Sequence, residues 1–313
     1  MSFDPLTRRA FLKRTSLAVA ALTLGFGRGV TAYAQALGSS LLVDPDELSE
    51  RLVPALSRCP SALRLLQSEF RLVDVRPEEE YLGAHSLSAV HFDQQATVAE
   101  RAGVPGLVPL PETVEELFGM AGLDPTLETV LYSDEGNLWA TRLFWMLEYY
   151  GHTNVRILDG GFARWARDES MLEEGEPKVT PDVARFQPEP DPSKIVDASW
   201  VEEHLGDPNV VFVDARPVES YDRGHLPGAV ALPWRENIDW DTEAFKTTGQ
   251  LLTRFAGQGV TPGKTVVSYC QLGVLSAHHY FVLRLLGYPD VRLYDGSWAD
   301  WTSVEGRPVE QSG

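Results

Sequence analysis

Two cysteine side chains are the most reactive groups in this sequence, and their surroundings differ. Cys59 and Cys270 are the only cysteines among 313 residues. Cys270 directly follows an apolar run and precedes a helical stretch. A thiol between a buried strand and a helix N-terminus faces inward-pointing N–H groups and the positive end of the helix dipole, which favour the thiolate. Such a thiolate can attack a sulfur atom and keep it as a persulfide.

The residues after Cys270 form the predicted binding loop. They are Gln271, Leu272, Gly273, Val274, Leu275 and Ser276. Gly273 lets the backbone turn tightly around an anion. We therefore predict that Cys270 is the catalytic nucleophile and that the N–H groups of this loop stabilise its persulfide and hold the substrate.

Two other roles for these thiols have to be weighed. A lone cysteine after an apolar strand is often a buried structural residue, and a Cys59–Cys270 disulfide would form in an oxidising compartment. The local contexts of the two residues argue against a disulfide. Cys59 precedes Pro60, so we expect it at the end of a helix that the proline stops.

The chain contains an internal repeat. Residues 72–81 reappear as residues 212–221, 140 positions later, and at that spacing His85 matches His225. Further on, the spacing becomes 136 positions and pairs Gly151 with Gly287, Arg156 with Arg292, Asp159 with Asp295 and Trp165 with Trp301. Two stretches that match in the same order indicate a duplicated domain of about 130 residues, a usual domain size.

The repeat divides the chain into predicted parts: a signal peptide at residues 1–36, a first domain at 40–174, a linker at 175–193 and a second domain at 194–313. The linker is rich in proline and shows no apolar periodicity. Each domain therefore has its own predicted core.

Each repeat alternates short apolar runs with helical stretches. The predicted strands are residues 71–75, 129–133, 210–215 and 265–269, and the predicted helices are residues 138–149 and 274–286. Gly151 and Gly287 follow those helices, where a left-handed cap is favoured. This alternation predicts two α/β domains, each a mainly parallel sheet flanked by helices. Cys270 then stands at the carboxyl end of a strand, where such sheets bind ligands.

The first repeat carries Asp134 at the position of Cys270, in the segment Ser133-Asp134-Glu135-Gly136-Asn137. An inert packing position does not readily exchange cysteine with aspartate, whereas a polar or reactive loop position does. The repeat therefore favours a reactive Cys270 over a structural one.

With these motifs the chain resembles the tandem-domain rhodaneses, the thiosulfate and 3-mercaptopyruvate sulfurtransferases. Both repeats carry Asp-x-Arg followed by Tyr and His, and the second alone carries a cysteine loop. Residues 224–229, Gly-His-Leu-Pro-Gly-Ala, and residues 294–298, Tyr-Asp-Gly-Ser-Trp, are similar to family segments. The resemblance covers about residues 40–309.

The resemblance implies two tandem rhodanese-like domains, of which the first, with Asp134, is catalytically silent. It also implies a mechanism: the Cys270 thiolate takes the outer sulfur of a small anionic donor and passes it to a thiol, to cyanide or to an acceptor protein. No cofactor is implied.

Some residues depart from the family pattern. Thiosulfate enzymes of the family carry basic residues after the cysteine and mercaptopyruvate enzymes small ones, whereas this chain has Gln271 and Leu272. A substrate-binding arginine of the family falls at Ser220 here, and Arg223 is a candidate replacement or a solvated surface residue. The donor therefore stays open between thiosulfate and 3-mercaptopyruvate.

Three residues of the second repeat are predicted to support the site: Asp214, Arg216 and His225. Arg216 is expected to pair with a carboxylate near the end of the sheet rather than to bind substrate.

Two alternative functions are considered. Cysteine phosphatases related to this fold use Cys-x5-Arg, in which the arginine binds phosphate, but the sixth residue after Cys270 is Ser276. The other alternative is a persulfide carrier that serves one partner protein, which the neutral loop favours more than a cationic loop would.

Composition and charge limit the partners. The formal net charge of −18 repels nucleic acid and anionic lipid, so neither is an expected partner. An anionic donor therefore needs a local site of dipoles or placed cations. His278 and His279 are adjacent and point to different helix faces, so we predict no metal site.

The N-terminus resembles a twin-arginine export signal. Arg8 and Arg9 are followed by Ala-Phe-Leu-Lys, then by an apolar stretch at residues 16–26 and by small residues that allow cleavage after Ala34 or Ala36. The apolar stretch is shorter than the ~20 residues that span a bilayer, so no stable membrane anchor is expected. We predict recognition by the twin-arginine export machinery and a periplasmic or secreted protein; an amphipathic helix that stays attached is the alternative.

Overall fold

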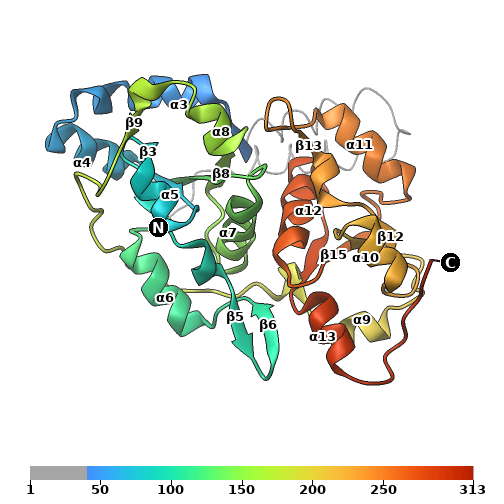
Figure 1. Ribbon diagram of the computed structural model, residues 1–313. Coiled ribbons are helices and arrows are strands. Elements are labelled where there is room, and N and C mark those ends of the chain that lie inside the picture. Colours follow the sequence, from blue (N-terminus) through green and yellow to red (C-terminus); the bar gives the residue numbers. More distant parts are fainter. Residues whose placement is uncertain (1–40, 313) are drawn as a thin grey trace, which may run out of the picture.

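The computed structural model describes residues 41–312 and contains two domains side by side, each a five-stranded parallel sheet flanked by helices (Figure 1). This confirms the predicted α/β fold class. The predicted signal peptide and its cleavage sites lie outside the described residues. Among the described residues, no helix combines the length and the apolar character needed to cross a membrane.

The first domain has the sheet order β1-β8-β7-β2-β4. Its strands are β1 (Leu42–Val43), β2 (Phe70–Asp74), β4 (Val90–His91), β7 (Glu128–Tyr132) and β8 (Val155–Leu158). Its helices are α3 (Pro45–Leu52), α4 (Pro60–Glu69), α5 (Glu78–Gly83), α6 (Pro111–Met120), α7 (Leu138–Tyr149) and α8 (Gly161–Trp165). Two antiparallel pairs lie outside the sheet: β3 (His85–Ser86) with β9 (Leu172–Glu173), and β5 (Ala99–Arg101) with β6 (Val104–Leu107).

The second domain repeats this order as β10-β16-β15-β11-β12. Its parallel strands are β10 (Ile195–Val196), β11 (Val210–Asp214), β12 (Val230–Ala231), β15 (Thr265–Tyr269) and β16 (Val291–Tyr294), and β13 (Ile238–Asp239) pairs with β14 (Ala244–Phe245) outside the sheet. Its helices are α9 (Ala198–Glu203), α10 (Val218–Arg223), α11 (Thr248–Gly257), α12 (Val274–Leu285) and α13 (Ser297–Ser303). The predicted strands and helices agree with those observed to within one residue at most ends. Gly151 and Gly287 adopt positive φ angles of 95° and 77°.

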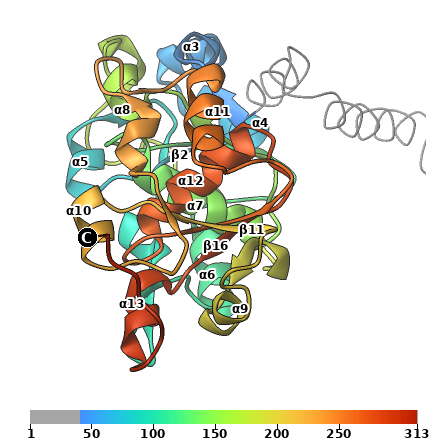
Figure 2. The same cartoon turned by 90° about the vertical axis from the view of Figure 1, so that its right-hand side faces the viewer.

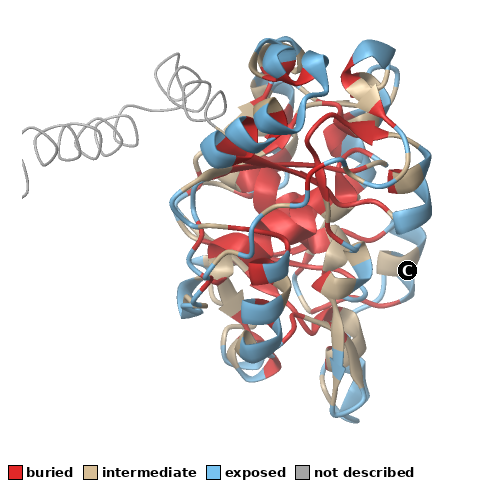
Figure 3. Cartoon of the chain, turned by 90° about the vertical axis from the view of Figure 1, so that its left-hand side faces the viewer, coloured by how far each residue is buried: buried red, intermediate tan, exposed pale blue. Residues whose placement is uncertain are grey.

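One hydrophobic core joins the two domains. The inner faces of both sheets pack on α6, α7, α11 and α12, while separate clusters cover the outer faces. Because side chains alternate along a strand, Val73 of β2 faces the shared core and Leu72 faces the outer cluster. Helices α7 and α12 meet at the centre, where the rings of Phe144 and Phe281 are 4.9 Å apart (Figures 1 and 2). Figure 3 shows the buried residues gathered in the sheet and the central helices.

The expectation for Cys59 holds in part. The 3-10 helix η1 (Val53–Ser57) ends just before Cys59, with Arg58 as its C-cap, but the proline also begins a new helix: Cys59 is the N-cap of α4, and Pro60 occupies the first turn of α4. Proline is favoured there because its missing N–H is one that the first turn of a helix leaves unpaired. Cys59 is exposed, Cys270 is buried, and both are free thiols.

Candidate active site

Cys270 lies at the carboxyl end of β15, at the contact between the two domains. Its side chain is only 1% exposed and packs in a small cluster with Ala215 and Trp234 of its own domain and Leu138 of the first domain. Leu138 begins α7, so the first domain supplies one wall of the cysteine pocket.

Polar contacts hold Cys270 on several sides. Its N–H donates to Ser297 Oγ at 3.1 Å, and its carbonyl oxygen accepts from the N–H of Trp298 at 2.9 Å. The hydroxyl of Ser276 donates to Cys270 Sγ at 3.6 Å. Since Ser276 is fully buried, this hydroxyl is held where it stabilises negative charge on the sulfur. Ser276 thus takes part in the cysteine environment, as predicted for the loop as a whole.

The backbone of the catalytic loop, residues 270–276, presents N–H groups without partners. Within the described chain, no hydrogen bond is found for the N–H groups of residues 271–275. Gly273 caps α12 with φ +80°, a conformation that favours glycine. Unpaired N–H groups at a helix N-terminus are suited to bind an anion. The loop can therefore accept negative charge on Cys270 or on a sulfur attached to it.

A hollow of about 200 Å³ lies beside Gln271, the neighbour of Cys270 in the chain. It is lined by Arg216, Ser220, Arg223, Gly224, Gln271 and Trp298. Arg223 is exposed and donates to Ser220 Oγ at 3.2 Å. The structure thus brings Arg223 to the predicted loop. Val274 and Leu275 do not line this hollow but pack against the buried cluster of Cys270.

Arg216 is paired as expected. Its guanidinium binds both carboxylate oxygens of Asp214, at 2.6 to 3.1 Å, and donates to the carbonyl of Gly224 at 2.7 Å. It also lies over the ring of Trp298, 4.5 Å from the ring centroid. These contacts use Nε and Nη2, and Nη1 has no hydrogen-bond partner among the described residues.

Comparison with known proteins gives the family. The model of the rhodanese-like domain matches residues 60–168 and again residues 197–304. The chain belongs to the rhodanese family. It is 34% identical over 244 residues to the 3-mercaptopyruvate sulfurtransferase of Escherichia coli K12, covering 74% of this chain and 85% of that protein. It is 31% identical over 259 residues to the thiosulfate sulfurtransferase of Pseudomonas aeruginosa, covering 80% and 94%.

Comparison with a solved structure supports the same family. The crystal structure of a 3-mercaptopyruvate sulfotransferase from Escherichia coli superposes with a TM-score of 0.71 at 30% identity, covering 83% of this chain and 99% of that chain. This rhodanese is therefore a sulfurtransferase of the thiosulfate or 3-mercaptopyruvate type.

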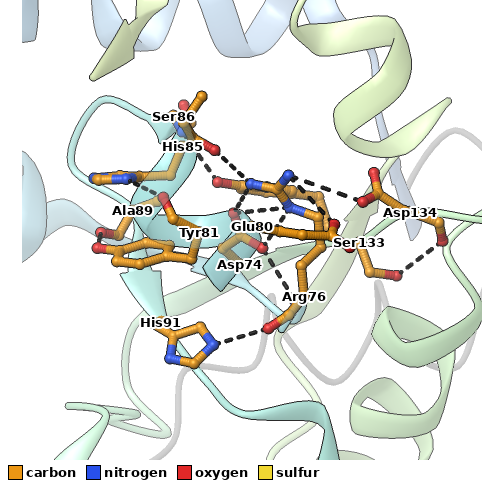
Figure 4. Close-up of polar contacts among 12 residues, drawn as sticks. Asp74, Arg76, Glu80, Tyr81, His85, Ser86, Ala89, His91, Ser133 and Asp134 are labelled. Atoms are coloured by element: carbon orange, nitrogen blue, oxygen red, sulfur yellow. Dashed lines mark hydrogen bonds and ion pairs between the residues drawn. The ribbon is translucent and has the colours of Figure 1, made fainter. Parts of the chain in front are cut away.

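The first domain of this rhodanese contains a second copy of the arginine site, which we call the silent site (Figure 4). Arg76 binds both carboxylate oxygens of Asp74 and donates to the carbonyl of Ala84, as Arg216 does in the second domain. Its Nη1, however, lies 3.8 Å from Glu80 Oε2 and 3.8 Å from Asp134 Oδ2. Two carboxylates thus face Nη1 of Arg76, whereas Nη1 of Arg216 has no partner among the described residues.

These carboxylates influence each other. Burial, and next the neighbouring Glu80 carboxylate, raise the pKa of Asp134 to about 7, while Arg76 opposes that rise. Glu80 corresponds to Ser220 in the repeat and Asp134 to Cys270. The silent site therefore has two carboxyl groups of the chain, Glu80 and Asp134, at the positions where the second domain has the hydroxyl of Ser220 and the thiol of Cys270.

The histidines of the two repeats have matching surroundings. His225 Nδ1 lies 2.9 Å from the carbonyl oxygen of Tyr221, and its ring stacks on that tyrosine at 3.6 Å. His85 makes the same contacts with Tyr81, at 2.8 Å and 3.9 Å. Because the silent site keeps this arrangement, His225 supports the fold of the loop near Arg216.

Sequence reasoning missed the residues that reach the site from the first domain. A Cβ atom at Gly106, in the β5–β6 hairpin, would lie 2.4 Å from the carbonyl oxygen of Leu272. Arg142 of α7 donates to the carbonyl of Gly273 at 3.3 Å. One signal pointed to Arg142: it is the only basic residue in α7, a helix that is otherwise largely apolar.

The adjacent histidines of α12 are buried. Burial lowers the pKa of His278 to about 3, and its Nε2 lies 3.2 Å from the carbonyl oxygen of Gly136 in the first domain. Burial also lowers the pKa of His279 far below its usual value. Among residues 41–312, no three His, Cys, Asp or Glu side chains lie close enough together to hold a metal ion.

Proposed function

We propose that this sulfurtransferase carries sulfane sulfur as a persulfide on Cys270. The observation that supports this most directly is the surroundings of the sulfur: the Ser276 hydroxyl at 3.6 Å and the unpaired N–H groups of residues 271–275. A hydroxyl that contacts the buried sulfur, together with N–H groups in the same loop that have no partner among the described residues, can stabilise the thiolate before the reaction and the terminal persulfide sulfur after it.

The reaction has two steps. The Cys270 thiolate attacks the outer sulfur of the donor, so that an Sγ–S bond forms and the bond between that sulfur and the rest of the donor breaks. Sulfite leaves with the bonding electrons if the donor is thiosulfate, and the enolate of pyruvate leaves and takes up a proton if it is 3-mercaptopyruvate. An acceptor thiolate or cyanide then attacks the outer sulfur and restores the Cys270 thiolate, which predicts ping-pong kinetics.

Arg216 and Arg223 are the proposed ligands of the donor anion. For Arg216 this goes beyond the purely structural role expected from the sequence, because its contacts with Asp214 and Gly224 use Nε and Nη2 and leave Nη1 for a ligand. In the silent site, Arg76 Nη1 faces two carboxylates, whereas the corresponding hollow beside Arg216 is lined by Ser220 and Arg223. A donor with an anionic group placed over Arg216 would thus fill the position that Glu80 fills in the first domain. The net charge of −18 makes such local cations necessary.

A phosphatase activity finds no support in this site. A phosphate ester needs a bidentate arginine at the sixth position after the cysteine. Ser276 occupies that position, and its hydroxyl contacts the sulfur itself. Phosphate-ester hydrolysis by the purified protein, without cyanide-accepting activity, would overturn the proposal.

Intact mass spectrometry after incubation with donor tests the persulfide. We expect one additional sulfur atom on the wild-type protein, which cyanide removes. Cys270→Ser should neither gain the sulfur nor turn over, whereas Cys59→Ser should keep both, because Cys59 is exposed at the start of α4 in the other domain. Loss of activity in a folded Cys59→Ser protein would contradict the assignment.

A donor panel separates the remaining choices. Comparing kcat/KM for thiosulfate and 3-mercaptopyruvate identifies the donor. Formation of the persulfide without turnover on free thiols or cyanide would favour the carrier alternative, in which one partner protein takes the sulfur. Leu272, 36% exposed next to Cys270, lies where such a partner would make contact.

We also propose export through the twin-arginine pathway. The support is the sequence: the Arg8–Arg9 pair, the apolar stretch after it and the small residues around Ala34. Replacing both arginines by lysine should leave the protein in the cytoplasm when cells are fractionated. Unchanged export of that variant would contradict the proposal.

A further inference from the structure

A buried cation of the silent domain reaches the catalytic loop. Arg142 lies on α7 and is fully buried. Its Nη1 donates to Asp295 Oδ1 at 2.8 Å and to the carbonyl oxygen of Gly273 at 3.3 Å, both in the second domain. Its other nitrogens donate to carbonyls of its own domain, Nη2 to Gly106 at 3.1 Å and Nε to Thr97 at 3.4 Å. One guanidinium therefore binds both domains.

Asp295 completes the connection from the other side. Its carboxylate is nearly fully buried, and its Oδ2 accepts the N–H of Val108 in the first domain at 2.6 Å. The carboxylate is thus bound by a side chain and by a main-chain group of the silent domain. A buried ion pair of this kind strongly fixes relative position, because separating the charges leaves each one buried and unpaired.

The Arg142–Asp295 pair lies close to Cys270 in the structure, through neighbouring residues that contact the Cys270 loop. Two residues after Asp295, Ser297 Oγ accepts the N–H of Cys270, and the N–H of Trp298 binds the Cys270 carbonyl. Gly273 lies so close that a Cβ atom there would be 2.7 Å from the Asp295 carbonyl oxygen. The main chain of Cys270 is therefore held by residues that follow Asp295, and the main chain of Gly273 is held by Arg142.

We infer that Arg142 and Asp295 are positioning residues for sulfur transfer, through which the silent domain holds the catalytic loop ready for the persulfide. The inference rests on the proposed role of Cys270. It assigns the first domain a function in the reaction: it keeps the N–H groups of residues 271–275 and the Ser276 hydroxyl directed at the sulfur. Preorganised donors of this kind stabilise developing charge without having to reorient during the reaction.

The repeat provides a matched control for Asp295. Asp159 is its counterpart in the first domain, 136 positions earlier. Asp159 Oδ1 accepts the N–H of Phe245 from the second domain at 3.0 Å, and Oδ2 pairs with Arg164 at 3.0 Å. Asp159 thus has an arginine of its own domain and a main-chain N–H of the opposite domain, whereas Asp295 takes both partners from the opposite domain, and Asp159 lies in the domain that carries Asp134 instead of the cysteine.

The experiment compares Asp295→Asn with Asp159→Asn in the full chain. Three quantities are measured: kcat and KM for the donor, the alkylation rate of Cys270 by iodoacetamide, and the melting temperature. We expect Asp295→Asn to lower kcat about tenfold or more with KM changed less than about threefold, because the loop that stabilises the reacting sulfur is disturbed. The alkylation rate should fall with kcat. Asp159→Asn should change both rates by less than about twofold.

Arg142 variants keep the inference testable if Asp295→Asn folds poorly. Arg142→Lys keeps the charge and should retain more kcat than Arg142→Met, which keeps the apolar volume alone. Equal losses of kcat in the Asp295 and Asp159 variants, or Arg142 variants that lower the melting temperature and leave kcat unchanged, would overturn the inference. If the wild-type protein forms no persulfide on Cys270, the proposed function fails, whereas the alkylation rate still reports on the positioning pair.

Discussion

The two arginine sites of this rhodanese share the contacts that hold the arginine, but they differ in the side chains next to it. Arg76 and Arg216 each bind an aspartate two residues earlier, a carbonyl eight residues later and an aromatic ring, Phe162 in one case and Trp298 in the other. The first site is filled by carboxylates of its own chain. The second has a thiol, a hydroxyl and a hollow of about 200 Å³.

This difference lies in a few side chains and not in the fold. The Asp-x-Arg pair, the stacked histidine and the sheet order are all retained in the first domain. Two side chains that face Arg76 differ from their counterparts in the repeat, Glu80 in place of Ser220 and Asp134 in place of Cys270. By the inference above, the first domain also holds the catalytic loop through Arg142.

The largest expected effect comes from making the catalytic site resemble the silent one. Cys270→Asp should lower donor turnover by about 10⁴-fold or more, because it removes the nucleophile. Turnover and intact mass measure the loss, and circular dichroism checks that the fold is kept. Residual transfer within about tenfold of wild type would place the nucleophile elsewhere.

A second change fills the hollow with charge. Ser220→Glu introduces the carboxylate that the silent site has at Glu80, and it should raise KM for anionic donors about 30-fold, as a like charge costing about 2 kcal/mol would. Ser220→Ala is the control and should bind donors nearly as wild type does. An unchanged KM in Ser220→Glu would show that the donor anion binds away from Arg216.

The reverse change tests whether the silent site can be opened. Asp134→Cys alone should form no persulfide, because Glu80 still faces the arginine. The double variant Asp134→Cys with Glu80→Ser, made in a Cys270→Ser background, should form one slowly, about 10²-fold below the wild-type rate. Mass spectrometry of proteolytic peptides shows which peptide carries the additional sulfur atom. Equal persulfide formation in the single and the double variant would show that Glu80 does not block the site.

The smallest effect concerns stability and pH. Burial and the neighbouring Glu80 carboxylate raise the pKa of Asp134 to about 7, from an ordinary aspartate value of 3.8. Between these values the folded protein retains a proton that the unfolded chain has lost, so this group makes the free energy of unfolding decrease as pH rises from about 4 to about 7. Above about pH 7 neither the folded nor the unfolded protein holds this proton, so the contribution of Asp134 to the free energy of unfolding no longer changes with pH.

Asp134→Asn removes this titration. Its free energy of unfolding should decrease less than that of the wild type between pH 5 and pH 7.5, as urea unfolding at both values measures. Glu135→Gln is the matched control on the exposed neighbouring residue and should behave as the wild type does. A wild-type slope that Asp134→Asn leaves unchanged would mean that Asp134 is ionised throughout this range.

Most of the fold was predictable because its signals are local. Valine-rich runs, helical stretches and the glycines after them lie within short windows, and the repeat shows each of them twice. The pairing of Arg216 was predictable from the Asp-x-Arg motif, since the partner is two residues away. Cys59 was placed only in part, because a proline fits both a helix end and a helix beginning: one helix ends at Ser57, and the next begins at Pro60.

The sequence by itself determined the two-domain α/β architecture and the family resemblance, and it made Cys270 the predicted nucleophile. The tertiary structure alone decided that Leu138, Gly106 and Arg142 of the silent domain contact the catalytic loop. The reason is physical. These contacts form when the inner faces of two sheets bury a common core, and they join residues 131 or more positions apart that no local periodicity relates.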